Sequence, residues 1–359
     1  MNPAAYTTPT LTRPDVARRL LDADGPVLVL THAKPDGDAF GSVVSVVATL
    51  RNLGRTARGV LVPPVPAALA ELPGAELADV YEDGAAIPFE PALVLIVDTG
   101  AWSQLGPLRA WVEPRLDRTL IVDHHLSGDV PAADRFVEGD AAAACEILAE
   151  LIELMAHHDT PAGRRAGDQS GFTTLPPVVR DALFVGIASD TGWFRFSNVR
   201  PQTHELAAKL IRQGTDHAAL YQRLEQAERP EKLALLTRAL QNLRLHGRGR
   251  AAVMPLRAID FHQTGALPEE TERLIDTPQM VGGIDVFVVV TEAVADDGSP
   301  GTRMSFRSKP GDDEATAVNV AALAARFGGG GHARAAGAKV DRPIDDVLTQ
   351  LAEELETLD

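Results

Sequence analysis

The chain has 359 residues, of which 45% are hydrophobic and 23% charged, and its formal net charge at pH 7 is -16. This length predicts about two domains, and the apolar content is sufficient for packed cores. The acidic balance argues against binding to long nucleic acid, which needs a basic surface. It leaves room for a phosphorylated substrate if a metal ion supplies positive charge locally.

The cysteine content and the absence of long apolar runs indicate a cytoplasmic protein. Cys145 is the single cysteine, so no internal disulfide can form. Residues 1–15 lack the apolar core of a signal peptide. No apolar stretch approaches the roughly 20 residues that a membrane span requires. We therefore expect no association with a membrane.

The predicted elements of the first half alternate between strands and helices. Residues 1–12 are expected to form a loose leader, followed by a helix over 15–21. Apolar runs predict strands over 27–30, 58–62, 93–97 and 120–122. Helical spacing predicts helices over 43–53, 141–155 and 178–188, the last only slightly favoured over a strand. This alternation predicts an α/β fold with a doubly wound parallel sheet.

The second half predicts a helical connection and a smaller domain. Residues 157–177 are expected to form a surface loop, to which we assign no function. The first domain is expected over 13–200, a helical linker over 201–245, and a second α/β domain with a mixed sheet over 246–356. In this second domain, strands are expected over 251–256, 284–293 and 301–309. Helices are expected over 268–280, 316–327 and 344–358.

An acid-rich loop follows the first predicted strand. His32, Asp36 and Asp38 lie between that strand and the next helix. Open α/β sheets bind their ligands at the carboxyl ends of the strands. Three such groups so close together would repel one another or titrate unfavourably without a cation. A hard divalent metal ion is the simplest way to satisfy them.

Three later segments also carry acids or histidines directly after apolar runs. Since the carboxyl ends of parallel strands share one edge, we expect these segments to converge on the first loop. Six ligands are too many for one catalytic ion, which keeps an open position, and they suit two ions about 3.5–4 Å apart that share a carboxylate. Oxygen ligands with some imidazole favour Mn²⁺, with Mg²⁺ or Co²⁺ as alternatives. The candidate ligands are His32, Asp36, Asp38, Asp98, His124 and Asp190.

Each part of this constellation also has a simpler interpretation. A lone aspartate after a strand is usually a turn residue or a helix cap, and Asp38 could cap a helix that begins at Ala39. The metal hypothesis is favoured because four segments share one topology and one ligand chemistry. Within it, Asp98 is expected to bridge the ions, and Gly37 and Gly41 are expected to let the loop turn tightly around them.

The motifs resemble those of the DHH phosphoesterase family. The signature is Asp123-His124-His125, and 32–42, 97–100 and 189–192 resemble three further motifs of the family. The glycine-rich stretch 328–332, followed by 334–337, resembles the DHH-associated C-terminal domain. The chain length and short linker resemble the nanoRNase branch. The resemblance implies a two-Mn²⁺ site built from the six ligands above, and hydrolysis of very short oligoribonucleotides. It further implies activity on 3′-phosphoadenosine 5′-phosphate or on linear and cyclic dinucleotides.

Residues outside the ligand set are expected to act on the substrate. We expect His125 to orient a ligand or to contact the scissile phosphate, and Asp123 also to lie behind the ligands without binding the ions. Arg195 is a further candidate for phosphate binding. With water activated by the two ions, in-line attack on phosphorus follows.

The second domain is expected to hold the end of the substrate. Backbone N–H groups of a glycine run can approach a phosphate closely, and alternate residues of the strand over 302–308 share one face. Arg303 could equally be a solvated residue of an edge strand, whereas the resemblance favours Arg307 and His332. The candidate substrate-binding residues here are Arg303, Ser305, Arg307, Gly330, Gly331 and His332.

Several other functions share parts of this pattern. A RecJ-like exonuclease would need a basic channel and extra domains, and a family II pyrophosphatase would have a different second domain. A cyclic-dinucleotide phosphodiesterase of signalling and a non-catalytic nucleotide-binding regulator stay open. The preferred substrate, the polarity of attack, the physiological metal and the oligomeric state do not follow from the sequence, although homodimers are common in this branch.

Overall fold

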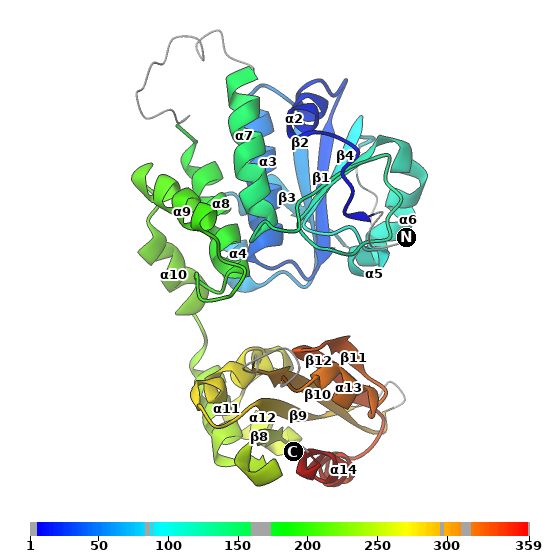
Figure 1. The fold of residues 1–359 in the computed structure, drawn as a ribbon, viewed down its shortest axis with the longest axis vertical. Coiled ribbons are helices and arrows are strands. Elements are labelled where there is room, and N and C mark those ends of the chain that lie inside the picture. Colours follow the sequence, from blue (N-terminus) through cyan, green and yellow to red (C-terminus); the bar gives the residue numbers. More distant parts are fainter. Residues whose placement is uncertain are drawn as a thin grey trace. The chain divides into compact units, whose positions relative to one another are not determined.

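The chain forms two compact units, which divide between Ala227 and Glu228 (Figure 1). This computed structural model describes residues 6–82, 87, 89–158, 174–294, 298–309 and 317–357. Most of the expected loop over 157–177 therefore lies outside the described residues. The expected linker is split between the units: α9 (Pro201–Arg212) and α10 (His217–Glu225) lie in the first, and α11 (Pro230–Gln241) in the second. None of the described helices has the length and apolar character needed to cross a membrane.

The first unit is built on a six-stranded sheet in which each neighbouring pair of strands is parallel. The order is β3-β2-β1-β4-β5-β6, so the chain leaves β1 toward one side and returns through β4 on the other. This confirms the predicted doubly wound parallel sheet, and it places a topological switch point between β1 and β4. The strands are β1 (Val27–Ala33), β2 (Ala57–Val62), β3 (Ala78–Val80), β4 (Leu93–Val97), β5 (Thr119–Asp123) and β6 (Asp134–Val137).

Helices cover both faces of this sheet (Figure 1). Alternate residues of β1 face opposite sides, as a strand requires: Val29 packs in one core cluster and Leu28 and Leu30 in another. The first cluster includes α2 (Arg13–Leu21), α3 (Gly37–Asn52), α7 (Ala144–His158) and α8 (Pro177–Asp190). The second includes α5 (Trp102–Leu105), η2 (Gly106–Leu108) and α6 (Arg109–Val112).

The expectation of a loose leader is wrong for the residues described there. Tyr6 is fully buried. Thr10 donates its N–H to the carbonyl oxygen of Arg135 at 2.9 Å and accepts the Arg135 N–H on its side chain at 2.8 Å. Thr12 caps α2, and Asp15 completes the capping box. The polar sequence concealed this order because the segment is held at the edge of the sheet, next to β6.

The second unit contains a six-stranded mixed sheet in the order β11-β12-β10-β9-β8-β7. Only β8 and β9 pair in parallel among these strands. One face packs on α13 (Val320–Ala325) and α14 (Ile344–Glu356), and the other on α11 and α12 (Ala258–Thr264). The strands are β7 (Arg244–His246), β8 (Ala251–Leu256), β9 (Val286–Val294), β10 (Pro300–Ser308), β11 (Gly330–His332) and β12 (Ala335–Val340).

Several elements of the second unit differ from the sequence prediction, and a helix and a strand show the physical reasons; the short elements β7, β11 and α12 were not predicted either. The helix expected over 268–280 is two 3-10 segments, Pro268–Thr271 and Leu274–Met280. Arg273 between them has a φ of 67°, which an α-helix cannot contain, and Pro278 removes a backbone donor. The strand β12 was not predicted, because its alanine and glycine residues lack the β-branched side chains typical of strands.

Candidate metal centre and substrate-binding face

Three of the predicted ligand segments lie at the carboxyl ends of adjacent strands. His32 is near the end of β1, Asp98 directly follows β4, and His124 directly follows β5. They therefore meet beside the switch point of the sheet. Asp190 differs from the others because it is the last residue of the helix α8 and does not follow a strand. It reaches the cluster because α8 packs closely on α3.

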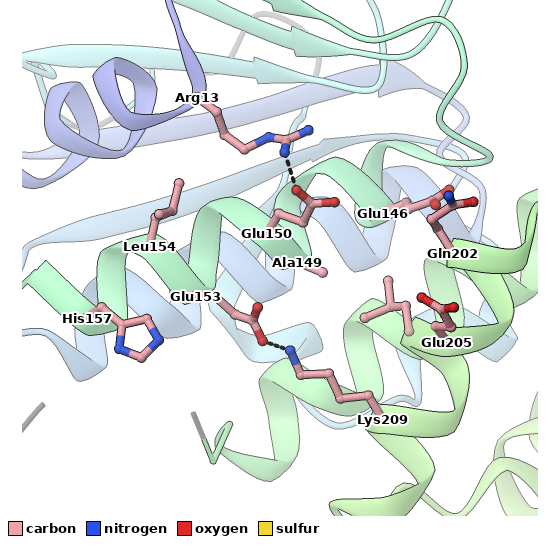
Figure 2. Close-up of a pocket in the computed structure, with 11 residues that line it drawn as sticks. Arg13, Glu146, Ala149, Glu150, Glu153, Leu154, His157, Gln202, Glu205 and Lys209 are labelled. Carbon is pink, nitrogen blue, oxygen red and sulfur yellow. Dashed lines mark hydrogen bonds and ion pairs between the residues drawn. The ribbon is translucent and has the colours of Figure 1, made fainter. Parts of the chain in front are cut away.

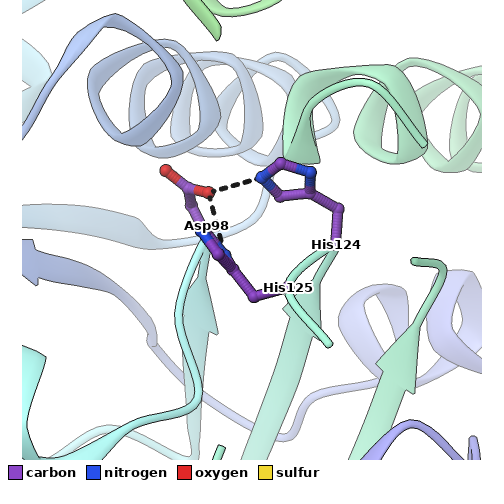
Figure 3. A group of neighbouring side chains, drawn as sticks. All are labelled: Asp98, His124 and His125. Carbon is purple, nitrogen blue, oxygen red and sulfur yellow. Dashed lines mark ion pairs between the residues drawn. The ribbon is translucent and has the colours of Figure 1, made fainter. Parts of the chain in front are cut away.

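Asp98 connects the candidate ligands, and Figure 3 shows one of its carboxylate oxygens beside both His124 and His125. Its Oδ1 is 3.3 Å from Nε2 of His124 and 3.8 Å from Nδ1 of His125, while its Oδ2 is 3.4 Å from Nε2 of His32. Only 2% of the residue is exposed. Its backbone has a φ of 60°, a conformation that costs free energy in residues other than glycine and recurs at functional sites. The two carboxylate oxygens thus face two different histidines.

The two aspartates of the first loop, Asp36 and Asp38, do not fit the simpler interpretation in which Asp38 caps the following helix. Asp36 is the N-cap of α3, because its Oδ1 accepts the backbone N–H groups of Asp38 and Ala39, each at 3.0 Å. Asp38 is therefore not a cap of its own helix. It is fully buried, and its carboxylate accepts N–H groups from Ala144 at 2.6 Å and Cys145 at 3.0 Å, at the start of α7. The partial positive charge of that helix start stabilises the carboxylate.

Gly37 and Gly41 allow α3 and α8 to pack closely. The sequence instead predicts that they let the first loop turn tightly around the ions. Neither has a positive φ. A Cβ at Gly37 would lie 2.4 Å from Oγ of Ser189, and one at Gly41 would lie 2.3 Å from the carbonyl oxygen of Ala182. Both therefore allow close packing of two helices, and they do not turn the loop around an ion. This packing places Asp190 beside His124, with Oδ2 and Nε2 3.7 Å apart.

Crowding of like charges shifts the pKa values in the cluster. Burial, with Asp98 and Asp190, raises the pKa of Asp38 well above its usual value. Burial raises the pKa of Asp190 to about 6, although His124 opposes the shift. Burial lowers the pKa of His124, but the nearby carboxylates of Asp98, Asp38 and Asp190 outweigh it, and the pKa rises to about 10. The pKa of His32 likewise rises to about 11, through Asp36 and Asp98.

The cluster contains the ligand types that a divalent cation prefers, and two of its buried polar atoms lack a hydrogen bond within the described part of the chain. Oδ1 of Asp98 and Nε2 of His124 are both buried and have no hydrogen-bond partner among the described residues. Each candidate histidine is oriented by its other nitrogen: Nδ1 of His32 donates to Ala33 at 3.0 Å, and Nδ1 of His124 donates to Ala141 at 3.2 Å. This leaves Nε2 of both rings for coordination, as is usual for metal-binding histidines.

Three groups of side chains have ligand atoms within 4.8 Å of one another. Asp98 and His124 each belong to two of these groups, so the groups form one continuous site. The first group is His32, Asp36 and Asp98; the second is Asp38, His124 and Asp190; the third is Asp98, His124 and His125. All six predicted ligands are therefore brought together, and their chemistry fits Mn²⁺ or Mg²⁺.

Asp123 and His125 form a hydrogen-bonded pair at the edge of the cluster. Nδ1 of His125 donates to Oδ1 of Asp123 at 2.8 Å, and the same oxygen accepts the backbone N–H groups of His124 and His125. Oδ2 of Asp123 accepts the hydroxyl of Tyr6 at 2.5 Å. Burial alone would raise the pKa of Asp123, but the bonds from His125 and Tyr6 hold it below its usual value. With its oxygens so occupied, Asp123 holds the His125 ring through Nδ1.

Tyr6 is a residue that the sequence argument did not place at the site. It stands among small and polar residues, and no motif or periodicity connects it with Asp123, which is 117 positions away. It is one of only three tyrosines in the chain, which is the sole signal that the sequence carried.

The substrate-binding side chains expected in the second unit, those of Arg303, Ser305, Arg307 and His332, share a face of its sheet. Arg303, Ser305 and Arg307 alternate on β10 with the buried residues Met304 and Phe306. In the strand register, Arg307 pairs with Ala335 of β12, and Ala335 pairs with His332 of β11. Laterally paired residues point to the same side of a sheet. Arg307 and His332 therefore face the same side, two strand spacings or about 10 Å apart.

The glycine run supports β11 and exposes its backbone. Gly330 and Gly331 are exposed residues of this edge strand. Gly331 has a φ of 143°, and a Cβ at Gly329 would lie 2.1 Å from the carbonyl oxygen of Gly337. Only glycine permits such an approach between these strands.

Arg195 lies in the first unit, in the turn after α8. Its Nε donates to the carbonyl oxygen of Gly192 at 2.6 Å, and its guanidinium carbon lies 5.9 Å from the centre of the Phe196 ring. The side chain is therefore partly engaged in its own turn.

A separate cavity of about 480 Å³ lies between α7 and α9 (Figure 2). Four glutamates line it, and Glu153 pairs with the buried amine of Lys209. None of the six predicted metal ligands is among its lining residues. The cavity is therefore distinct from the cluster at the sheet edge.

Comparison with known proteins agrees with this arrangement. Residues 26–187, which include the first loop, Asp98 and His124, match the model of the DHH family, N-terminal domain. This chain carries a DHH-family domain. The predicted resemblance is confirmed, and five of the six candidate ligands lie within the matched residues, with Asp190 just beyond them.

Relatives of this DHH chain extend over nearly its whole length. It is 29% identical over 349 residues to "Bifunctional oligoribonuclease and PAP phosphatase NrnA" of Thermus thermophilus, covering 95% of this chain and 93% of the relative. The protein of the same name from Bacillus subtilis is 25% identical over 329 residues, covering 90% and 94%. An exopolyphosphatase-related protein from Bacteroides fragilis has a similar fold, with a TM-score of 0.81, 19% identity and 96% and 97% coverage.

Proposed function

We propose that this chain is a metal-dependent phosphoesterase that hydrolyses very short oligoribonucleotides to mononucleotides. We further propose activity on 3′-phosphoadenosine 5′-phosphate and on dinucleotides such as pApA. The convergence of three aspartates and two histidines on Asp98 carries the proposal, because this donor set suits divalent cations that act on phosphate esters. The two relatives named as oligoribonuclease and PAP phosphatase support the choice of substrates.

The candidate ligands divide into two sets that share Asp98. His32 and Asp36 would hold one ion with Oδ2 of Asp98, and Asp38, His124 and Asp190 would hold a second with Oδ1. Two divalent ions, preferably Mn²⁺, would supply Lewis-acid stabilisation of the phosphoryl charge and activate water.

His125 is proposed to contact the reacting phosphate. Asp123 fixes the ring through Nδ1, so Nε2 can donate a hydrogen bond to a phosphoryl oxygen. The hydrogen bond to Asp123 raises the pKa of His125, which keeps the ring protonated and positively charged nearer to neutral pH. His125 thereby contributes charge where negative charge develops in the transition state.

The second unit is proposed to bind the terminal phosphate of the substrate. Arg303, Ser305, Arg307 and His332 offer charged and hydroxyl donors on one face, and the backbone of Gly330 and Gly331 is accessible beside them. A site that binds the end of an RNA molecule gains no affinity from additional nucleotides. This explains a preference for short substrates, and it accords with a net charge of -16, which disfavours long nucleic acid. Because the chain has one cysteine and no internal disulfide, we place this activity in the cytoplasm.

A substrate panel tests the proposed function. Purified protein with Mn²⁺ is given RNAs of two to ten nucleotides, pApA, cyclic di-AMP and 3′-phosphoadenosine 5′-phosphate, and the products are separated by chromatography. We expect turnover of the shortest RNAs and of 3′-phosphoadenosine 5′-phosphate, with rates falling as the RNA lengthens. Preferred hydrolysis of cyclic di-AMP would favour a signalling phosphodiesterase. No hydrolysis of any of these would favour a nucleotide-binding regulator.

The phosphate-binding face is tested by Arg307→Ala. A charge-assisted hydrogen bond contributes about 1.5–3 kcal/mol, so kcat/KM for a dinucleotide is expected to fall about 10- to 100-fold, mainly through KM. The matched control is Arg326→Ala, which removes an exposed ion pair with Glu354 in the same unit and should leave KM unchanged. Equal KM values for both variants would contradict the assignment of Arg307.

A further inference from the structure

The buried side chain of Tyr6 connects the start of the described chain to the DHH motif. Its exposed fraction is 0%, and its Oη donates to Oδ2 of Asp123 at 2.5 Å. Burial, reinforced by the negative charge of Asp123, raises the pKa of Tyr6 above its usual value, so the hydroxyl stays protonated and can donate. The hydroxyl is therefore available as the donor of this hydrogen bond.

Two glycines form the space that the Tyr6 ring occupies. A Cβ at Gly100 would lie 1.9 Å from Oη, and a Cβ at Gly128 would lie 2.3 Å from Cε2 of the ring. Real Cβ atoms do not approach other heavy atoms so closely, so any larger residue at either position would displace the ring. Gly100 follows β4 and Gly128 follows the histidine pair, so the ring is packed between the two segments that carry Asp98 and His125.

The segment that carries Tyr6 is itself held in place. The backbone and side chain of Thr10 bond to Arg135 in β6, and the capping box of Thr12 and Asp15 fixes the start of α2. These contacts fix the backbone that follows Tyr6. The Tyr6 hydroxyl can therefore hold the neighbouring carboxylate of Asp123 in one position.

Asp123 forms hydrogen bonds with both Tyr6 and His125, so it connects the two side chains. Its Oδ1 accepts three donors: the N–H groups of His124 and His125 at 2.8 and 3.1 Å, and Nδ1 of His125 at 2.8 Å. Its Oδ2 accepts Oη of Tyr6. Donors on both oxygens fix the rotation of the carboxylate plane, and that rotation determines where Oδ1 directs the His125 ring. The ring itself is 44% exposed, so packing alone does not hold it.

We propose that Tyr6 is a positioning residue for His125, and that it acts through the carboxylate of Asp123. Its hydroxyl bonds to Asp123, which is not one of the six candidate metal ligands. Its catalytic consequence rests on the proposed function, in which His125 meets the phosphate. Loss of an outer hydrogen bond of this kind lowers activity by about 10- to 100-fold.

The kinetic test is Tyr6→Phe in the full chain, which keeps the ring and removes the hydroxyl. We expect kcat on a dinucleotide to fall about 10- to 100-fold, with KM and Mn²⁺ stoichiometry unchanged. Tyr81→Phe, a partly buried tyrosine beyond β3, is the matched control and should retain wild-type kcat. Unchanged kcat in Tyr6→Phe would overturn the catalytic part of the proposal.

A double-mutant cycle separates positioning from general destabilisation. If Tyr6 acts through His125, then Tyr6→Phe should have no further effect on kcat in a His125→Ala background. A purely structural loss would reduce kcat by the same factor in both backgrounds. If the two substitutions lower kcat independently, so that their factors multiply, the proposal that Tyr6 acts through His125 is refuted.

A spectroscopic arm distinguishes failure of this proposal from failure of the proposed function. In metal-free protein, nitrogen-15 NMR of the histidine rings should show a protected Nδ1–H for His125. Tyr6→Phe should abolish that protection, and Gly128→Ala should do so as well, because it displaces the ring but keeps the hydroxyl. If wild-type protein hydrolyses nothing but these changes occur, the positioning role stands and the phosphoesterase proposal fails. If His125 is unchanged in both variants, the positioning role is refuted.

Discussion

Replacing Asp98 with asparagine tests the proposed metal centre at the residue that its two ligand sets share. The carboxylate lies 3.3 Å from Nε2 of His124 and 3.4 Å from Nε2 of His32. Asparagine has nearly the same shape, and it also tolerates the left-handed backbone that Asp98 adopts at a φ of 60°. Asp98→Asn therefore removes one negative charge and changes little else.

The size of the expected effect follows from that charge. Two unit charges about 4 Å apart interact by about 4 kcal/mol at an effective dielectric constant of about 20. A divalent ion carries two such charges, so at about 1.4 kcal/mol for each factor of ten its affinity should fall by at least roughly 10³-fold. In the metal-free protein, two effects of the lost charge oppose each other. Repulsion with Asp38, whose pKa burial and then Asp98 raise, is relieved, but His32 and His124 lose a carboxylate that raises their pKa values. The change in melting temperature on adding Mn²⁺ is therefore the quantity that reports on the metal site.

The assay combines Mn²⁺ titration by calorimetry with thermal melting in the presence and absence of metal. Wild-type protein should bind two ions and be stabilised by them, whereas Asp98→Asn should bind weakly and gain little stability. The control is Asp79→Asn, which removes a partly exposed carboxylate that pairs with Arg58 on an outer strand. It should titrate like the wild type. Wild-type Mn²⁺ affinity and turnover in Asp98→Asn would refute the assignment of a shared ligand.

Two further predictions concern pH and helix packing. Mn²⁺ binding should release protons and weaken as pH falls from 8 to 5.5, because the metal-free pKa is about 10 for His124 and about 6 for Asp190, and these protons must leave before coordination. Calorimetry in buffers of different ionisation enthalpy measures the release, and a pH-independent affinity would contradict the prediction. Gly41→Ala should lower the free energy of unfolding by about 1–3 kcal/mol, because its Cβ would meet the carbonyl oxygen of Ala182. Denaturant titration checks this against Gly283→Ala, which faces open space and should change stability by less than about 0.5 kcal/mol.

The sequence was sufficient to predict the parallel sheet and the residues that gather at its edge. Strands such as β1 and β4 are apolar on both faces, and a short polar stretch ends each of them. Because parallel strands share one carboxyl edge, a one-dimensional pattern implies a three-dimensional meeting point. His32, Asp98 and His124 could be grouped on that basis alone.

The same argument did not explain how Asp190 joins the group. It ends a helix, and its approach depends on close packing of α3 and α8 at Gly37 and Gly41. Packing of helices is a property of side-chain volumes across the two elements, so local periodicity does not contain it. For the same reason, the sequence suggested that these glycines shape the loop, whereas in the structure they permit contact between helices.

Local sequence determined the chemistry available to this protein: a loop of acids after a strand, a histidine pair after another, and arginines on alternate positions of β10. Tertiary structure alone decided which of these groups face one another and what holds them. Asp38 is stabilised by the start of α7, more than 100 residues away, and Asp123 accepts a hydrogen bond from Tyr6. Contacts at such separations depend on how the whole sheet and its helices pack, because hydrogen bonds and packing contacts act between neighbours in space, and neither motif nor periodicity encodes those neighbours.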